Sequence, residues 1–359
     1  MTIPRFWTDP KSGANYSFGD KLPSSDFNAF LAGWRNIDYA IERNQALTYP
    51  GLETISGTLF SACAIDDQFD QILLLSDVTA STSVFCLKLT PSGQQDSTRT
   101  VSGEPAGGWT TTSGCITSDG AGTIVIGGTT VNASTKKVAV ATDGGNFTTQ
   151  DVNASGAGVG VTALAYEANG GLFIAGLNGG TTATTIETSP DGVTWTGRTN
   201  ANTNAISRIA TDGNGTVVAI SSASTNQAVR STDGGATWSA VTLPATAVWT
   251  GITYSPGLGK WFVTNGTNSA SSGTGSTWDS ITMSAALVLL GSTGNLVIGQ
   301  RSTGDLYVSE DGEEFARVGT GVSIGAISAN NLWVTSTGIV ALVNDGSDSE
   351  VQISSLYHV

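Results

Sequence analysis

A short pattern recurs along the chain at intervals of roughly 40 residues, and it constrains the fold more than any other feature. Residues 231–238 read S-T-D-G-G-A-T-W, and residues 189–195 carry the same pattern with one residue fewer. Residues 271–278 keep every position except the Asp. Residues 141–147 and 309–315 carry Phe in place of Trp. A repeat at this period predicts a fold built from many copies of one small unit.

The residue types of the pattern suit a tight turn between two strands. The Asp accepts hydrogen bonds from the backbone of the turn ahead of it. The Gly supplies the positive φ that a tight hairpin requires. The aromatic residue starts the next strand and can bury its ring against an adjacent sheet. We therefore interpret these key residues as structural and not catalytic: Asp143, Asp191, Trp195, Asp233, Trp238, Trp278, Asp311 and Phe315.

A second series of turns lies upstream of each copy. Residues 118–123 and 211–216 are near duplicates, and an apolar, strand-like run precedes and follows each such turn. Four strands per unit at this repeat length are typical of propeller blades. We expect the units to span residues 52–112, 113–158, 159–202, 203–246, 247–284, 285–320 and 321–359. The sequence thus predicts an all-β, seven-bladed β-propeller, whereas the alternative parallel β-helix has shorter repeats without a D-G hairpin in each.

The copies of the S-x-D-x-G-x-T-W pattern resemble the Asp-box (BNR) repeat of sialidase-like β-propellers. The likeness covers residues 113–320 directly and residues 52–359 by phase. This likeness implies the fold but not the function, because function depends on the particular residues of a site. A photosynthetic assembly factor also uses a seven-bladed Asp-box propeller, but it carries an arginine patch that this chain lacks.

Sialidases of that family grip a carboxylate with three arginines and use a Tyr nucleophile paired with Glu. An early R-I-P element is typical of them, but here Ile3, Pro4 and Arg5 stand in the wrong order and precede the blades. Tyr166 and Tyr254 end the first strands of their units, on the turn side, away from the usual sialidase pocket. Sialidase activity is therefore not predicted.

The sequence also lacks the residue patterns that other kinds of catalysis require. A glycoside hydrolase needs two carboxylates about 5–10 Å apart, and the acidic residues outside the turns, Glu104, Glu167 and Glu187, are not marked as a pair. The chain has a single His, His358, so that Ser-His-Asp and Cys-His catalysis are disfavoured. Its three Cys form no C-x-x-C pair. We expect a protein that is not an enzyme and that holds no cofactor and no metal.

Charge excludes two classes of partner. The formal net charge is −14, and charged residues make up 12% of the chain, about half of the usual 25%. An acidic chain repels phosphate backbones and anionic membrane surfaces, so we expect no nucleic acid. The longest apolar run, residues 285–290, is far shorter than the roughly 20 residues of a membrane span, so no membrane insertion is expected. No signal peptide is visible at the N-terminus.

Residues 1–51 depart from the blade pattern. Residues 4–21 read as an extended arm, and residues 23–26, P-S-S-D, are helix-start signals. Apolar residues then follow at helical spacing as far as Arg43. They form one stripe of a predicted amphipathic helix: Phe27, Phe30, Leu31, Trp34, Ile37 and Ile41. This stripe packs either on the propeller itself or on another subunit.

The arm and helix resemble the N-terminal attachment segments of bacteriophage tail and virion proteins. The resemblance implies a non-enzymatic virion protein of tail or fibre, anchored to other virion subunits through residues 1–50 in an oligomeric assembly. Its propeller, residues 52–359, would then be displayed for binding host-surface carbohydrate. The alternatives are a carbohydrate-active enzyme, or a cellular scaffold or assembly factor with a cytoplasmic location.

A ligand would bind where loops rich in Ser, Thr, Asn and Gly gather. In a propeller these are the loops between second and third strands and the crossings between blades, on the face opposite the Asp-box hairpins. Trp109 and Trp249 each stand in a crossing just before a first strand. Such rings would stack on sugars if exposed, or else pack between blades. The candidate binding residues are Trp109, Trp249, Lys136, Lys137, Asn178 and Asn226.

Overall fold

The computed structural model describes residues 6–8, 15–17, 60–66, 71–76, 85–89, 95–103, 108–153, 158–179, 185–200, 204–317, 332–334, 338–344 and 349–355. All the regular secondary structure in these residues is β-strand, so the described part of the chain is all-β as predicted. Near the N-terminus, β1 (Phe6–Thr8) pairs antiparallel with β2 (Asn15–Ser17). The predicted helix, with all six residues of its apolar stripe, lies outside the described residues.

Four successive sheets each contain four antiparallel strands in chain order. The first holds β11 (Val161–Glu167), β12 (Leu172–Leu177), β13 (Ile186–Ser189) and β14 (Thr196–Arg198). The second holds β15 (Ile206–Thr211), β16 (Val217–Ser221), β17 (Thr225–Ser231) and β18 (Ser239–Ala247). The third holds β19 (Gly251–Ser255), β20 (Lys260–Thr264), β21 (Ser269–Ser272) and β22 (Asp279–Ile281). The fourth holds β23 (Leu289–Thr293), β24 (Leu296–Gln300), β25 (Leu306–Ser309) and β26 (Ala316–Arg317).

Two further runs of four strands precede these sheets and are joined to one another. They are β3 (Phe60–Asp66), β4 (Gln71–Ser76), β5 (Phe85–Leu89) and β6 (Gln95–Ser102), then β7 (Trp109–Ser118), β8 (Ile124–Thr130), β9 (Lys136–Ala141) and β10 (Phe147–Asp151). The last strands of the two runs, β6 and β10, pair in parallel, with Val101 opposite Phe147. This join, which was not predicted from the sequence, turns two runs into one eight-stranded sheet.

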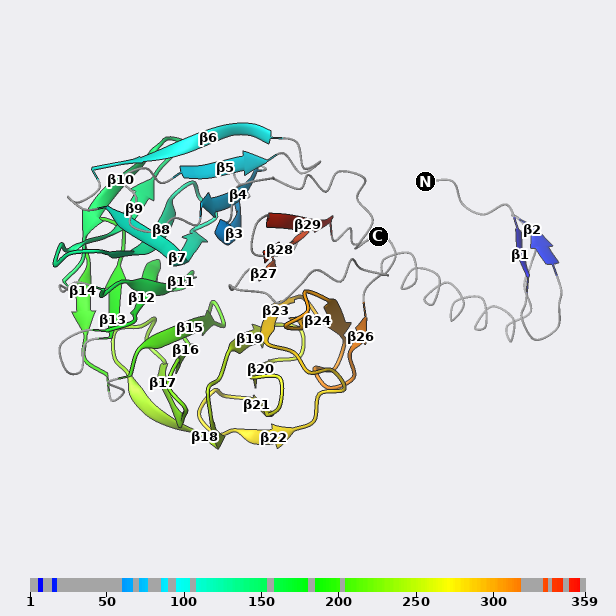
Figure 1. The fold of residues 1–359 in the computed structure, drawn as a ribbon. Coiled ribbons are helices and arrows are strands. Elements are labelled where there is room, and N and C mark those ends of the chain that lie inside the picture. The colour runs from blue at the N-terminus through cyan, green and yellow to red at the C-terminus, as the bar shows by residue number, and fades with distance from the viewer. Residues whose placement is uncertain are drawn as a thin grey trace.

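The last sheet contains β27 (Leu332–Val334), β28 (Gly338–Asn344) and β29 (Ser349–Ser355). Figure 1 shows the sheets set around a common centre, with the first strand of each run innermost. These inner strands contact one another in chain order from β3 to β27, and β27 in turn contacts β3. Successive four-stranded sheets in a closed circle fit a β-propeller.

The core lies between neighbouring sheets. Val125 of β8 and Val140 of β9 pack in one cluster with Phe173 of β12 and Trp195, which precedes β14. All five residues of β16 are buried, because the sheets on either side cover both of its faces. Each sheet is therefore stabilised by its two neighbours, as expected for a propeller.

The repeated hairpin of one sheet approaches the preceding sheet closely at Gly312. Gly312 has a φ of +83°, in the left-handed region that favours glycine. A Cβ on Gly312 would lie 2.2 Å from the Phe262 ring of β20. Gly273 stands in the preceding repeat, and a Cβ there would meet no atom within 4 Å.

We predict that Gly312→Ala lowers the free energy of unfolding by about 2–4 kcal/mol, through backbone strain together with overpacking against Phe262. The matched variant Gly273→Ala should change it by less than about 1 kcal/mol. Chemical denaturation followed by tryptophan fluorescence measures both. Equal effects of the two substitutions would contradict the described packing.

Candidate functional site

The side chains of the repeated hairpin form hydrogen bonds with one another and with the hairpin's own backbone. In residues 231–238 the Ser231 hydroxyl donates to Asp233 Oδ1 at 2.8 Å and accepts from the N–H of Gly235 at 2.8 Å. The N–H of Thr237 donates to Asp233 Oδ1 at 2.8 Å. The Trp238 indole N–H donates back to the Gly235 carbonyl at 2.9 Å. The turn thus supplies its own partners for backbone groups that would otherwise need water.

The same bonds recur in the other copies. Asp191 Oδ1 accepts from the N–H groups two and three residues further on, at 2.8 and 2.7 Å. Asp311 does the same at 2.8 and 2.9 Å. These backbone hydrogen bonds, beginning with that from Glu313, hold the pKa of Asp311 below its ordinary value. The indole N–H groups of Trp195 and Trp278 each donate to a turn carbonyl, at 2.8 and 3.1 Å. These carboxylates are therefore engaged by the turns, as expected for structural residues.

The two Phe copies differ in detail. Asp143 lies in the left-handed region with a φ of 49°, and its N–H donates to the Gly122 carbonyl at 3.1 Å. The N–H of Phe315 donates to Ser284 Oγ at 2.6 Å. Gly122 belongs to the second series of turns, so the bond from Asp143 brings the two series together on one face.

Two buried carboxylates tie neighbouring sheets together. Glu167 accepts from the N–H of Gly170 in its own turn at 2.5 Å and from the N–H of Gly215 in the next sheet's turn at 2.9 Å. Glu187 accepts from Asn153, which follows β10, through the backbone N–H at 3.0 Å and the side-chain Nδ2 at 3.2 Å. Glu104 lies outside the described residues. Both described carboxylates thus bind backbone N–H groups of neighbouring segments.

Of the two alternatives for Trp109 and Trp249, the structure shows the second, in which the rings pack between sheets. The two residues are 0% and 2% exposed. Trp109 is the first residue of β7, not part of a crossing, and its indole N–H donates to the Lys136 carbonyl at 2.6 Å. Trp249 packs in a core cluster with Leu243 and Ile252, from the sheets on either side of it. An aromatic residue entering a first strand is therefore an anchor between sheets, and neither ring can stack on a ligand.

Lys137 was also predicted wrongly as a surface cation. It is buried, and its Nζ donates to Thr130 Oγ1 at 2.8 Å and to the Val159 carbonyl at 2.7 Å. Burial lowers the pKa of its ammonium group to about 8. Lys136, beside it, is half-buried and donates to the Gly103 carbonyl at 3.4 Å. The predicted pair of cations therefore does not form a binding patch.

The two predicted amides have different surroundings. Asn178 follows β12, and its side chain accepts from the N–H of Gly160 at 2.8 Å and donates to the Gly158 carbonyl at 3.1 Å. Asn226 is half-buried in β17, the third strand of the next sheet. The two amides thus belong to two different sheets.

A cavity of about 200 Å³ lies instead at the centre of the circle of sheets. The inner strands of all the described runs from β3 to β27 contribute to it. Its lining includes Cys63, Cys115, Ile116, Ala163, Arg208, Ile209, Ile252, Leu290 and Leu332. Among these, Arg208 of β15 carries the charge. We call this space the axial cavity.

A second hollow, of about 340 Å³, lies on the face that carries the turns. Its lining includes Thr211, Asp212, Thr253, Tyr254, Pro256 and Ser292. The ring of Tyr254 is packed at 49° against Trp261, with 5.0 Å between centroids. Asp212 Oδ1 accepts from the N–H groups of Asn214 and Thr216 at 2.8 and 2.9 Å. We call this space the turn-face hollow; sequence reasoning missed it because it looked to the opposite face.

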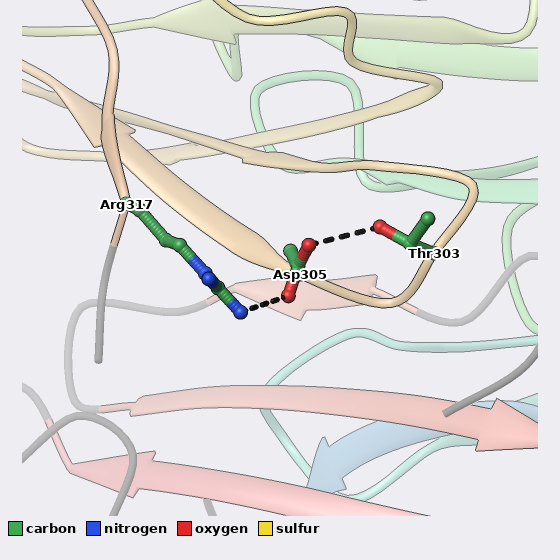
Figure 2. Close-up of polar contacts among 3 residues, drawn as sticks. All are labelled: Thr303, Asp305 and Arg317. Carbon is green, nitrogen blue, oxygen red and sulfur yellow. Dashed lines mark hydrogen bonds and ion pairs between the residues drawn. The ribbon is translucent and has the colours of Figure 1, made fainter. Parts of the chain in front are cut away.

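One exposed cation forms an ion pair at the surface. Arg317 of β26 donates from Nη2 to Asp305 Oδ1 at 2.6 Å, and the Thr303 hydroxyl donates to Asp305 Oδ2 at 3.0 Å, as Figure 2 shows. The Arg317 side chain is exposed. This pair is a solvated surface contact of the kind worth at most about 1 kcal/mol.

Comparison with known proteins adds little to this description. No protein-family model matches the chain, and none of the curated proteins matches it. A solved structure described as YCF48 bound to D1 peptide is similar to it, at 14% identity and a TM-score of 0.48. That match covers 67% of this chain and 79% of the other. Within the described residues, no helix is long and apolar enough to cross a membrane, and no group of three or more metal-ligating side chains is present.

We predict that Glu167→Gln lowers the free energy of unfolding by about 1–3 kcal/mol, because an amide replaces one carboxylate oxygen that accepts backbone N–H groups. Denaturant titration of the variant measures the loss. The exposed Glu310→Gln, which follows β25, is the control and should leave the free energy unchanged within about 0.5 kcal/mol. An unchanged stability for Glu167→Gln would contradict the bond between neighbouring turns.

Stability should also depend on pH through Lys137. Its ammonium group loses a proton near pH 8 in the folded chain and near pH 10.5 when unfolded. Between these values the unfolded state binds more protons, so the stability of the protein relative to Lys137→Met should rise with pH. Parallel denaturant titrations from pH 7.5 to 10.5 measure this difference. A difference that stays flat or falls would contradict the burial of the charge.

Proposed function

We propose that the chain is a seven-bladed Asp-box propeller that serves as a non-enzymatic bacteriophage virion protein, in tail or fibre, and binds host-surface glycan through the turn-face hollow. In this proposal β3–β6 and β7–β10 are two blades joined at their outer edges. The four sheets from β11 to β26 are four more, and β27–β29 belong to the seventh. The hydrogen-bonded turns at Asp191, Asp233 and Asp311 support the Asp-box assignment.

The observation that carries the glycan proposal is the grouping of an aromatic ring with hydroxyls and a carboxylate. Tyr254, Thr253, Ser292 and Asp212 line one hollow. Sugars offer an apolar ring face and a rim of hydroxyls, so they suit an aromatic surface flanked by polar groups. Trp261 fixes the orientation of the Tyr254 ring, and Asp212 Oδ2 can accept from a sugar hydroxyl while Oδ1 holds the turn.

The virion part of the proposal is supported by the N-terminal segment. Its apolar stripe, which includes Phe30 and Trp34, needs a partner surface, and its pattern is similar to attachment segments of virion proteins. A low-charge body rich in Gly, Ser and Thr is compatible with that role. Anchoring by residues 1–51 would leave the propeller displayed toward the host.

The glycan proposal is tested with bacterial lipopolysaccharides and capsular polysaccharides immobilised on an array. We expect saturable binding that Tyr254→Ala weakens at least about tenfold, or ~1.4 kcal/mol. Tyr166→Ala is the matched control, since Tyr166 is the last but one residue of β11, the first strand of another sheet, and packs on Phe173 with 4.9 Å between ring centroids. Tyr166 does not line the turn-face hollow, so its variant should bind like the unsubstituted chain.

Absence of binding to every polysaccharide, or equal weakening by both variants, would overturn the glycan proposal. Reducing ends released from a bound polysaccharide would instead support the carbohydrate-active enzyme. Folding of each variant is checked by circular dichroism and thermal unfolding, so that a loss of binding is read only for a folded chain.

The anchoring proposal has its own test. If the gene lies among those of phage head and tail proteins, purified particles of that phage should contain the chain. Trp34→Asp should remove it from the particles, because a charge then stands in the apolar stripe. Asn36→Asp, on the opposite side of the predicted helix, should leave it in place. A gene lying among cellular assembly genes, or particles that keep the Trp34→Asp chain, would contradict this role.

A further inference from the structure

Arg208 occupies an unusual place in the molecule. It belongs to β15, an inner strand, and lines the axial cavity together with residues from the inner strands of the other sheets. Its neighbours in that lining are mainly apolar or small, such as Ile209, Ile252 and Leu290. The lining residues within the described part of the chain include no Asp and no Glu. A guanidinium group thus lines a small, largely apolar space that provides it with no described carboxylate.

A half-buried guanidinium that lines a largely apolar space calls for a counter-charge and for partners to its five N–H donors. Nη1 of Arg208 donates to the carbonyl of its neighbour Ser207, a neutral acceptor that supplies no counter-charge. Burial lowers the pKa of Arg208 to about 10, so the group is charged at neutral pH. Burial raises the pKa of the nearby Cys115 thiol to about 12, so that thiol is neutral and supplies no negative charge.

Two other described arginines are placed differently. Arg317 pairs with Asp305 at the surface, and Arg230 donates from Nε to the Thr274 carbonyl of the next sheet's turn at 2.8 Å. Neither lines the axial cavity. Within the described residues, the cavity thus combines one positive charge that has no carboxylate partner with largely apolar walls. This combination favours a ligand that carries one negative charge and an apolar part.

We propose that the axial cavity binds a small organic monocarboxylate through Arg208. The planar guanidinium fork matches the two oxygens of a carboxylate. The apolar part of the acid would contact Ile209, Ile252 and Leu290 and gain the free energy of apolar burial. One guanidinium balances one negative charge, so a dianion such as phosphate would be left uncompensated. This site is separate from the turn-face hollow, and it stands or falls independently of glycan binding.

The probe is 4-fluorobenzoate, added to the full chain and followed by fluorine NMR. We expect a saturable shift and broadening of its resonance in the millimolar range or below. The neutral isostere 4-fluorobenzamide should bind at least tenfold more weakly, because it lacks the charge that Arg208 recognises. Equal binding of the acid and the amide, or no saturable binding of the acid, would overturn the proposal.

Variants then locate the site. Arg208→Met should weaken 4-fluorobenzoate binding at least tenfold, and Arg208→Lys should weaken it less, because the charge stays but the fork is lost. Arg317→Gln, which removes an exposed arginine, should leave binding unchanged. Unchanged binding in a folded Arg208→Met chain would place the acid elsewhere and overturn the proposal. Where Arg208→Met does not fold, Arg208→Lys and the comparison of acid with amide decide the matter.

Discussion

The fold depends on finding partners for the backbone N–H groups of its turns. Each repeat folds back in a hairpin that packs against the neighbouring sheet, where water cannot serve every donor. Ser231 and Asp233 provide the oxygens within one hairpin, and Glu167 provides them between the turns of two sheets. Once these bonds are made, the glycine-rich turns can lie close enough for the sheets to share a core.

This constraint also explains the composition. A chain with 12% charged residues devotes many of its carboxylates to turns, where they act as acceptors for the backbone. The cations are few, so the position of each one is informative. Lys137 is held by a hydroxyl and a carbonyl inside the fold, Arg317 by a carboxylate at the surface, and Arg208 faces a cavity at the centre. Only the last of these is placed to receive an anion.

The repeat predicted the strands well because its turn residues have local requirements. The Asp and Gly of each hairpin mark where a strand ends, so the four-stranded sheets from β11 to β26 followed from residue types alone. The parallel pairing of β6 with β10 did not, because it depends on how two sheets meet at their outer edges. The bond from the Gly215 N–H to Glu167 spans 48 positions and joins the turns of two sheets, so it too depends on how neighbouring sheets meet.

The site was harder to predict than the fold. Trp109 and Trp249 stand among polar loop residues, so that the sequence left open whether they are exposed or buried, and the sheets on either side bury them. The sequence around Arg208 indicates a strand and nothing more. The closed arrangement of sheets is what places Arg208 in a central cavity. The turn-face hollow arises from turns of several sheets brought together on one face. A site built from separate repeats thus cannot be predicted from the residues of any single repeat.

The most direct test of the central claim, a displayed propeller held by its N-terminal segment, is a cryo-electron microscopy reconstruction of the particle that carries this chain. The account predicts seven sheets around one axis, projecting from the particle, with residues 1–51 bound to another virion protein. A particle without the chain, or a propeller whose N-terminal segment packs only on its own sheets, would contradict it.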